Sequence, residues 1–349
     1  MINKAIIIGW INKGKPADCG ETMKNQLLIR RLEELRIKCY LVDFKGWKKK
    51  PWVFLQLVWF LLIYKDSNLI FSTSAKNIYK LMKLMQKIGW KQNIIHWVIG
   101  GNLQDCIAEK KYEACVFDYA NKTLVESDIM VKRLTEQGIH NVIQVPNFKP
   151  INYYPNISER LNKSSNEIIK FVFLSRIMPE KGCSYILEAA KLLNANGYEN
   201  KFMIDFYGKV AESYTNEFHD CLDNLANVSY KNFLNLKENE GYNKLASYDI
   251  MLFPTYWRGE GFAGVFIDAF ICGLPMIITD WAHNKSFMKE NEMAIYIPVH
   301  NVEALYIAMK DCIDRKIDYK SMALNCQSEA SKYDVNNVVT DKLLSNIFN

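Results

Sequence analysis

Short apolar runs alternate along the chain with longer segments whose apolar positions recur every three or four residues. The short runs are typical of buried strands and the longer segments of helices. In the first 150 residues the predicted strands are Ala5–Ile8, Cys39–Phe44, Leu69–Ser72, Ile94–Ile99 and Val142–Pro146. Helices are predicted there over 21–35, 52–64, 75–88, 103–120 and 129–137.

The second half repeats this alternation, and helices fill the intervals between its strands. The predicted strands are Phe171–Ser175, Phe202–Tyr207, Val228–Phe233, Ile250–Pro254, Met276–Thr279 and Ala294–Ile297. Strands joined by helix-length connections pair in parallel, in sheets covered on both faces. The pattern predicts an α/β protein with two doubly wound, Rossmann-like domains and a ligand cleft at the carboxyl ends of the strands.

The length of 349 residues fits about two domains. A stretch rich in Pro, Asn and Ser, without periodicity, runs from Pro146 to Asn166 and predicts a linker. We therefore expect an N-terminal domain over 1–150, a linker over 151–168, a C-terminal domain over 169–334 and a terminal helix over 335–349.

Charge is distributed unevenly over the two halves. Residues 1–150 hold 24 Lys and Arg against 13 Asp and Glu, whereas the remainder is slightly acidic. The first half is therefore expected to face something anionic. Nucleic acid is not expected, because the second half is acidic and no nucleic-acid motif occurs.

Other composition features narrow the class of protein. The nine cysteines include no C-x-x-C pair, so neither a disulfide framework nor a zinc site is expected. The N-terminal apolar run is too short for a signal peptide, which predicts a cytoplasmic chain. The longest apolar stretch, Val53–Tyr64, falls short of the ~20 residues that cross a bilayer.

Two cations follow the first predicted strand of the second half. Arg176 stands at the strand end, and Lys181 stands just before a helix. A helix N-terminus favours anions, so the pair is suited to bind a diphosphate. On local grounds a solvated surface pair is the alternative.

A glycine-rich segment follows the strand Ile250–Pro254. Gly259, Gly261 and Gly264 allow close approach of a ligand, and a helix is predicted to begin near Gly264. Glu260 lies in the loop and Asp268 about one turn into the helix. Both carboxylates are expected to face one cleft.

In this order the motifs resemble glycosyltransferase family 4, the "group 1" set of retaining, nucleotide-sugar-dependent enzymes with the GT-B fold of two Rossmann-like domains facing a central cleft. The similar segments are Ser175-Arg176 with Lys181-Gly182, Tyr207-Gly208, Ala246–Pro254, and Glu260 to Pro275. The resemblance covers most of residues 169–315. The segments Trp257–Glu260 and Trp281–Asn284 look most like bacterial capsular and exopolysaccharide transferases.

The resemblance implies roles for individual residues. Arg176 and Lys181 would bind the donor diphosphate, and Glu260, grouped with them as catalytic, would contact hydroxyls of the transferred sugar. Asp268 stands where the family usually has Glu and would hold the nucleotide ribose. The further donor-binding residues would be Gly20, Gly208, Gly261, Phe262, Ala263 and Gly264.

The resemblance also implies a reaction. It is retaining hexosyl transfer in which the leaving phosphate helps to deprotonate the acceptor, with a nucleotide-diphosphate-sugar as co-substrate. Neither a metal nor another cofactor is implied. The terminal helix would return to the N-terminal domain.

Two candidate sites lie in the first half. Gly20 precedes a helix and resembles the family's N-terminal glycine loop. His96 and Gly101 lie near the end of a predicted strand and are possible contacts of the sugar or the acceptor. For His96 a role in the core is the alternative.

Lysines recur at helical spacing over 75–91, after a basic and aromatic segment. Together they predict a patch that binds an anionic membrane surface, the inner face of the cytoplasmic membrane. A solvated charged face and a buried helix over 53–64 are the alternatives. The patch comprises Lys48, Lys49, Lys50, Trp52, Lys76, Lys80, Lys83, Lys87 and Lys91.

The sequence thus predicts a glycosyltransferase that extends a lipid-linked or membrane-bound glycan in surface polysaccharide synthesis. One alternative keeps the fold with epimerase or hydrolase chemistry on a nucleotide sugar. The other is a non-catalytic protein that docks on membranes and supports assembly.

Overall fold

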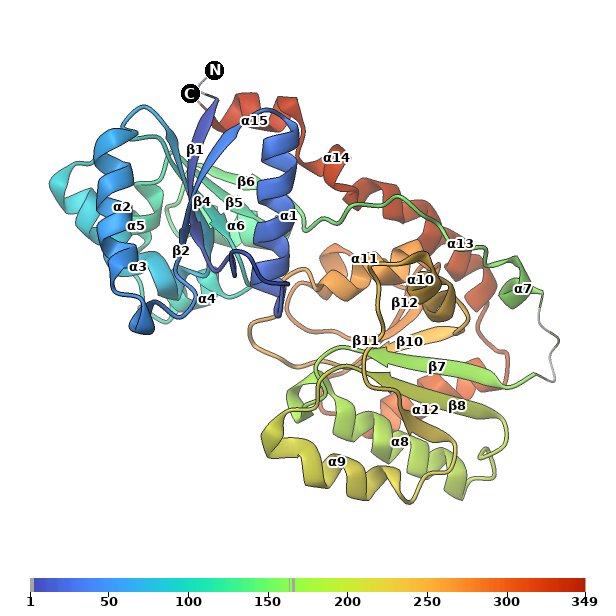
Figure 1. The fold of residues 1–349 in the computed structure, drawn as a ribbon. Helices are drawn as coiled ribbons and strands as arrows, with labels where there is room; N and C mark the ends of the chain where they lie inside the picture. Colours follow the sequence, from blue (N-terminus) through green and yellow to red (C-terminus); the bar gives the residue numbers. More distant parts are fainter. Residues whose placement is uncertain (1–2, 163, 165–166, 349) are drawn as a thin grey trace. The chain divides into compact units, whose positions relative to one another are not determined.

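The computed structural model describes residues 3–162, 164 and 167–348. The chain divides into two compact units (Figure 1): unit 1 comprises residues 1–150 and 332–349, and unit 2 comprises residues 151–331.

Unit 1 is built on a parallel sheet of six strands in the order β2-β1-β3-β4-β5-β6. All of β1, β3 and β4 is buried apart from Lys4, as expected for strands covered on both faces. The strands are β1 Lys4–Gly9, β2 Lys38–Asp43, β3 Asn68–Thr73, β4 Ile94–Val98, β5 Lys122–Val125 and β6 Val142–Gln144.

Two groups of helices cover the faces of this sheet. α1 packs on one face together with the last residues of the chain, and α2 and α3 share the hydrophobic core of the other face. The helices are α1 Gly20–Glu34, α2 Trp52–Ile63, α3 Ala75–Ile88, α4 Leu103–Ala108, α5 Ala114–Asp118, α6 Asp128–Glu136, α14 Val335–Val338 and α15 Asp341–Ile347.

Unit 2 holds a second parallel sheet, in the order β12-β11-β10-β7-β8-β9. Its strands are β7 Ile169–Leu174, β8 Phe202–Tyr207, β9 Val228–Tyr230, β10 Ile250–Phe253, β11 Met276–Thr279 and β12 Ala294–Ile297. The strand order reverses between β7 and β10, and such a switch point is where doubly wound sheets bind ligands.

α8, α9 and α12 cover one face of this sheet and enclose a hydrophobic core with it. The remaining helices include α11, whose Phe266 packs edge-on against Phe253 of β10. The helices are α7 Ser158–Leu161, α8 Cys183–Ala195, α9 Thr215–Leu222, α10 Asn239–Ala246, α11 Gly264–Ile271, α12 Val302–Ile313 and α13 Tyr319–Glu329.

The prediction of two doubly wound α/β sheets is confirmed, but one segment is wrong. The single helix expected over 103–120 is two short helices, α4 and α5, and the following strand β5 was not predicted. β5 is only four residues long and begins with Lys122, so its apolar run is too short to stand out.

The segment between the two sheets and the segment at the end of the chain each pack against one of the units. Residues 151–161 belong to unit 2, where the buried Arg160 donates a 2.7 Å hydrogen bond to the carbonyl of Tyr248 and another to that of Gly273. Residues 332–349 belong to unit 1, where Val339 and Leu344 share a core with Ala5 and Ile7 of β1.

Candidate functional site

The loops that follow β7 and β10 lie side by side at the switch point of unit 2. The two strands are paired, Ile250 against Phe171, and the backbone N–H of Tyr256 donates a 2.8 Å hydrogen bond to the carbonyl of Glu180. Gly182 is required for this approach: its φ is +80°, and a Cβ there would lie 2.2 Å from the carbonyl oxygen of Pro254.

Lys181 and Glu260 meet where these loops touch. The ammonium group of Lys181 donates to Oε2 of Glu260, and each side chain is only 8% exposed. The Thr255 hydroxyl donates to the same carboxylate oxygen at 3.1 Å. Burial of the pair makes each charge dependent on the other, because an unpaired charge in such a place is costly.

Arg176 lies at the exposed rim of the same loops. Its guanidinium carbon is 5.7 Å from the centre of the Trp257 ring. Trp257 is held in turn, because its carbonyl accepts a 2.9 Å hydrogen bond from the indole N–H of Trp281. The exposed guanidinium group of Arg176 and the buried ammonium group of Lys181 thus lie on the same loop, which follows β7.

Gly208 follows β8, the strand beside β7. Its φ is +141°, and a Cβ would lie 1.7 Å from the carbonyl oxygen of Ser175, the residue before Arg176. Any side chain at Gly208 would therefore push the Arg176 loop away.

Helix α11 begins at Gly264 as predicted, directly after the glycine-rich loop. Ala263 precedes it without a capping side chain, so the first N–H groups of the helix receive no side-chain cap there. Phe262 is buried and stacks on Phe287, with 4.0 Å between ring centres. Phe262 thus anchors the loop through its side chain, and it can offer a ligand only backbone atoms.

Asp268 lies on α11 and is 4% exposed. Its Oδ1 accepts a 3.1 Å hydrogen bond from the hydroxyl of Tyr242 on α10. Burial and the neighbouring carboxylate raise the pKa of Tyr242, so its phenol stays protonated and donates.

The structure thus brings the predicted residues of unit 2 together around β7, β8 and β10. Sequence reasoning missed Thr255 and Tyr242. Thr255 directly follows Pro254 at the end of the strand, and this position at the carboxyl end of a strand was the signal that could have identified it. No sequence signal linked Tyr242 to Asp268, because the contact joins two helices.

In unit 1, Gly20 begins α1 and is exposed, and a Cβ there would meet no atom within 4 Å. Space therefore does not require glycine at this position. Gly101 is buried, and its carbonyl accepts a 2.6 Å hydrogen bond from the amide of Gln104.

His96 lies inside β4 and is fully buried. Its ring stacks on Phe117, and Nε2 is 3.4 Å from the carbonyl oxygen of Thr73. Burial lowers the pKa of His96 to about 4. In the structure His96 is therefore a neutral histidine of the core. This fits the alternative considered for it, a role in the core, better than a contact with the sugar or the acceptor.

Polar groups that the sequence did not single out lie at the carboxyl edge of the unit 1 sheet. Lys24 of α1 forms a buried 2.7 Å ion pair with Glu126, which follows β5. Glu21 accepts a 2.5 Å hydrogen bond from the Thr73 hydroxyl, and burial raises its pKa.

The predicted lysine patch is exposed throughout. Lys48 and Lys49 belong to a short 3-10 turn over Trp47–Lys49, and Trp52 begins α2. All five predicted lysines over 75–91 are exposed, although Lys83 forms an ion pair with Glu113, whereas Ile78, Met82 and Met85 of α3 are buried.

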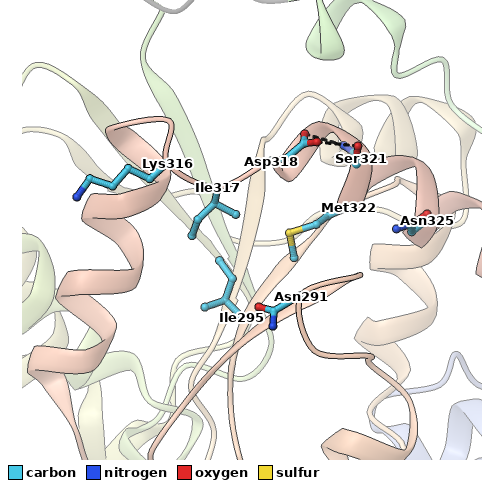
Figure 2. Close-up of a pocket in the computed structure, with 8 residues that line it drawn as sticks. All are labelled: Asn291, Ile295, Lys316, Ile317, Asp318, Ser321, Met322 and Asn325. Atoms are coloured by element: carbon cyan, nitrogen blue, oxygen red, sulfur yellow. Dashed lines mark hydrogen bonds between the residues drawn. The ribbon is translucent and has the colours of Figure 1, made fainter.

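A separate pocket in unit 2 holds none of the predicted site residues (Figure 2). It measures about 390 Å³ and is lined by Asn291, Ile295, Lys316, Ile317, Asp318, Ser321, Met322 and Asn325. Its carboxylate, Asp318, caps α13 by accepting hydrogen bonds from the backbone and hydroxyl of Ser321. Asp318 and Ser321 therefore serve the start of α13.

Within residues 3–162, 164 and 167–348, no three His, Cys, Asp or Glu side chains gather in a way that could hold a metal ion. Over the same residues, no helix combines the length and apolarity needed to cross a bilayer.

Residues 169–315 match the family described as "Glycosyl transferases group 1", which confirms the resemblance over that segment. An Escherichia coli UDP-Gal:alpha-D-GlcNAc-diphosphoundecaprenol alpha-1,3-galactosyltransferase is 22% identical over 60% of this chain and 53% of its own length. The chain spans about half the length of the curated relatives it matches.

Solved structures match nearly the whole chain. Anabaena HepE in complex with UDP superposes with a TM-score of 0.74 at 14% identity, over 98% of this chain and 100% of that one. The lipopolysaccharide outer core galactosyltransferase WaaB gives 0.69 at 15% identity, over 99% and 98%. The GT-B fold predicted from the motifs is therefore confirmed.

Proposed function

We propose that this chain is a retaining, metal-independent glycosyltransferase that moves a hexose from a nucleoside diphosphate sugar to a lipid-linked or membrane-bound glycan acceptor. One observation carries the proposal. Arg176, Lys181, Glu260 and the uncapped start of α11 converge at the switch point of unit 2, within the segment that matches the group 1 family. The solved HepE complexes contain UDP and UDP-glucose, which supports a nucleotide donor.

The cations would act on the leaving diphosphate. Breaking the bond from sugar to phosphate adds negative charge to the diphosphate, and groups fixed beside it stabilise that charge most in the transition state. A diphosphate beside Lys181 competes with Glu260 for the ammonium group. Glu260 then becomes available to accept hydrogen bonds from hydroxyls of the transferred sugar.

Asp268 would hold the ribose hydroxyls. Asp is one methylene shorter than the Glu usual in the family, and Tyr242 fixes its carboxylate through Oδ1. We assign Tyr242 as the positioning residue for Asp268, which would give a short side chain a defined direction.

The proton of the acceptor hydroxyl would pass to an oxygen of the departing phosphate on the same face of the sugar, so the configuration at the anomeric carbon is retained. The new bond joins the acceptor oxygen to the anomeric carbon, and the nucleoside diphosphate leaves with the bonding electrons and the proton. No protein base is required, consistent with the charged pairing of Lys181 and Glu260.

The acceptor assignment rests on the basic first half and on the relatives. The Escherichia coli relative is named for an acceptor on diphosphoundecaprenol. A lipid-linked acceptor requires an enzyme at the membrane, and the exposed lysines of unit 1 suit an anionic surface. We therefore propose that the protein acts at the inner face of the cytoplasmic membrane, in surface polysaccharide synthesis.

A panel of nucleoside diphosphate sugars, followed by NMR with and without a lipid-linked glycan, tests this proposal. We expect one donor to give a new glycoside with the donor's anomeric configuration, only when acceptor is present. An epimerised or hydrolysed sugar formed equally well without acceptor indicates the epimerase or hydrolase alternative. Failure of every donor to bind indicates the non-catalytic alternative.

A further inference from the structure

Helix α2 buries only a narrow stripe of its surface in the core of unit 1. Val53, Leu57 and Leu61 are buried at a spacing of four residues, and Gln56 and Phe60 are half-buried, whereas the other residues of the helix are apolar and exposed. Leu55 is 74% exposed and Trp59 61%. We call the exposed side the outer face of α2; it comprises Trp52, Phe54, Leu55, Val58, Trp59, Leu62 and Ile63.

This finding removes the possibility that the apolar segment is simply a buried helix. Soluble proteins seldom expose a continuous apolar surface of this kind without a partner for it. Apolar side chains are also exposed in nearby elements: Trp47 before α2, and Leu84 and Ile88 on α3. α2 and α3 belong to the same unit (Figure 1) and share its hydrophobic core.

Lysines are frequent in the segments before and after α2. Residues 44–104 contain ten lysines and a single acidic residue, Asp66. α3 covers the same face of the sheet as α2, and its lysines are exposed. On α3 the exposed Leu84 and Ile88 alternate with Lys83 and Lys87, so apolar and cationic side chains share one outer surface.

Charge decides which partner fits this surface. A second copy would bring two sets of lysines together, and like charges oppose such a contact. An anionic leaflet offers acyl chains for the apolar side chains and headgroups for the lysines. Tryptophan and lysine side chains are both suited to the boundary between water and lipid.

We propose that the outer face of α2 inserts into an anionic membrane leaflet while the α3 lysines contact the headgroups. The twelve residues of α2 are too few to span a bilayer, so the helix lies in the plane of the surface. The inference deepens the proposed function by giving the membrane contact its inserted residues. It predicts a salt-resistant apolar contribution to binding in addition to the salt-sensitive contribution of the lysines.

The test is co-sedimentation of the full chain with phosphatidylcholine vesicles, with and without phosphatidylglycerol. The variant is Leu55→Gln/Trp59→Gln, and the matched control is Ile307→Gln/Leu324→Gln, which replaces two exposed apolar residues on helices of unit 2. We expect wild type and control to bind anionic vesicles equally. Binding of the α2 variant should fall about tenfold or more, because its inserted apolar area is lost.

Insertion itself is measured by quenching of tryptophan fluorescence with lipids brominated in the acyl chain. Quenching is expected in wild type and should decrease in Trp52→Phe/Trp59→Phe. Equal binding of wild type and the α2 variant would overturn the proposal, because the lysines alone would then suffice. So would a wild-type dimer that fails to bind vesicles and becomes monomeric in the α2 variant.

Failure here is distinguishable from failure of the proposed function, since vesicle binding needs no sugar transfer. A chain that binds vesicles through α2 but turns over no nucleotide sugar contradicts the enzyme assignment alone. A chain that transfers sugar to a soluble acceptor but ignores vesicles contradicts the insertion alone.

Discussion

Two regions of the molecule depart from the usual rule of burial, in opposite directions. At the switch point of unit 2, the charged side chains of Lys181 and Glu260 are buried against each other. On α2 of unit 1, tryptophan and leucine side chains are exposed. A buried charge lowers stability unless it is paired, whereas an exposed apolar surface favours association with a partner. This contrast supports our proposals that the first region binds a small charged ligand and that the second binds an extended surface.

The largest expected effect comes from the buried charge. Glu260→Gln keeps the size of the side chain but removes the carboxylate that faces Lys181, so sugar transfer should fall about a thousandfold. Glu290→Gln, at an exposed position, is the control. Initial rates of transfer measure the effect, and circular dichroism checks the fold. Equal rates in the two variants would remove Glu260 from the reaction.

The next effect concerns the backbone that supports the same region. Gly208→Ala should lower the free energy of unfolding by about 3 kcal/mol, because its Cβ collides with the carbonyl of Ser175. Gly197→Ala is the control: its φ is also positive, but a Cβ there meets nothing within 4 Å. Urea unfolding of both variants measures the difference. Equal losses would show that positive φ alone, and not the contact, sets the cost.

His96, on β4 of unit 1, is a third departure from the usual rule of burial, because it is a buried polar group without a charged partner. Burial lowers its pKa to about 4 in the folded chain, against about 6.5 when unfolded. Between these values only the unfolded chain takes up the proton, so stability falls as the pH falls from 6.5 toward 4. The loss from His96 is about 2 kcal/mol near pH 5.

NMR titration of the ring, assigned with His96→Gln, measures this pKa directly. A titration near pH 6.5 would contradict the buried, neutral state. It would also reopen a role for His96 as a ligand contact.

The smallest expected effect lies on the basic surface. A single change, Lys87→Gln, should weaken binding to anionic vesicles about fivefold at low salt and less at high salt, since each lysine contributes about 1 kcal/mol. Lys342→Gln, exposed on α15 of the same unit, is the control. Co-sedimentation at two salt concentrations measures both. An identical loss in both variants would point to net charge and not to the α3 surface.

Much of the fold was predictable, because strands buried on both faces stand out as apolar runs. The loop-to-helix boundary at Gly264 and the strands of unit 2 followed from glycine and apolar patterns. β5 did not, because only two of its residues, Leu124 and Val125, are apolar.

The site was predictable as a set of residues but not as a set of contacts. The motifs named Lys181 and Glu260 separately, but their ion pair depends on how two loops meet. The link from Tyr242 to Asp268 joins separate helices. The apolar run of α2 was evident, yet only the packing of Val53, Leu57 and Leu61 decides which side faces outward.

Calorimetric titration of the chain with nucleoside diphosphates tests the central assignment, a nucleotide donor held at the switch point of unit 2. We expect one diphosphate to bind saturably, and Arg176→Gln to weaken it about tenfold or more through loss of a charged contact. Arg30→Gln, an exposed arginine of unit 1, should leave binding unchanged. Binding of no nucleoside diphosphate, or equal binding by both variants, would contradict the assignment.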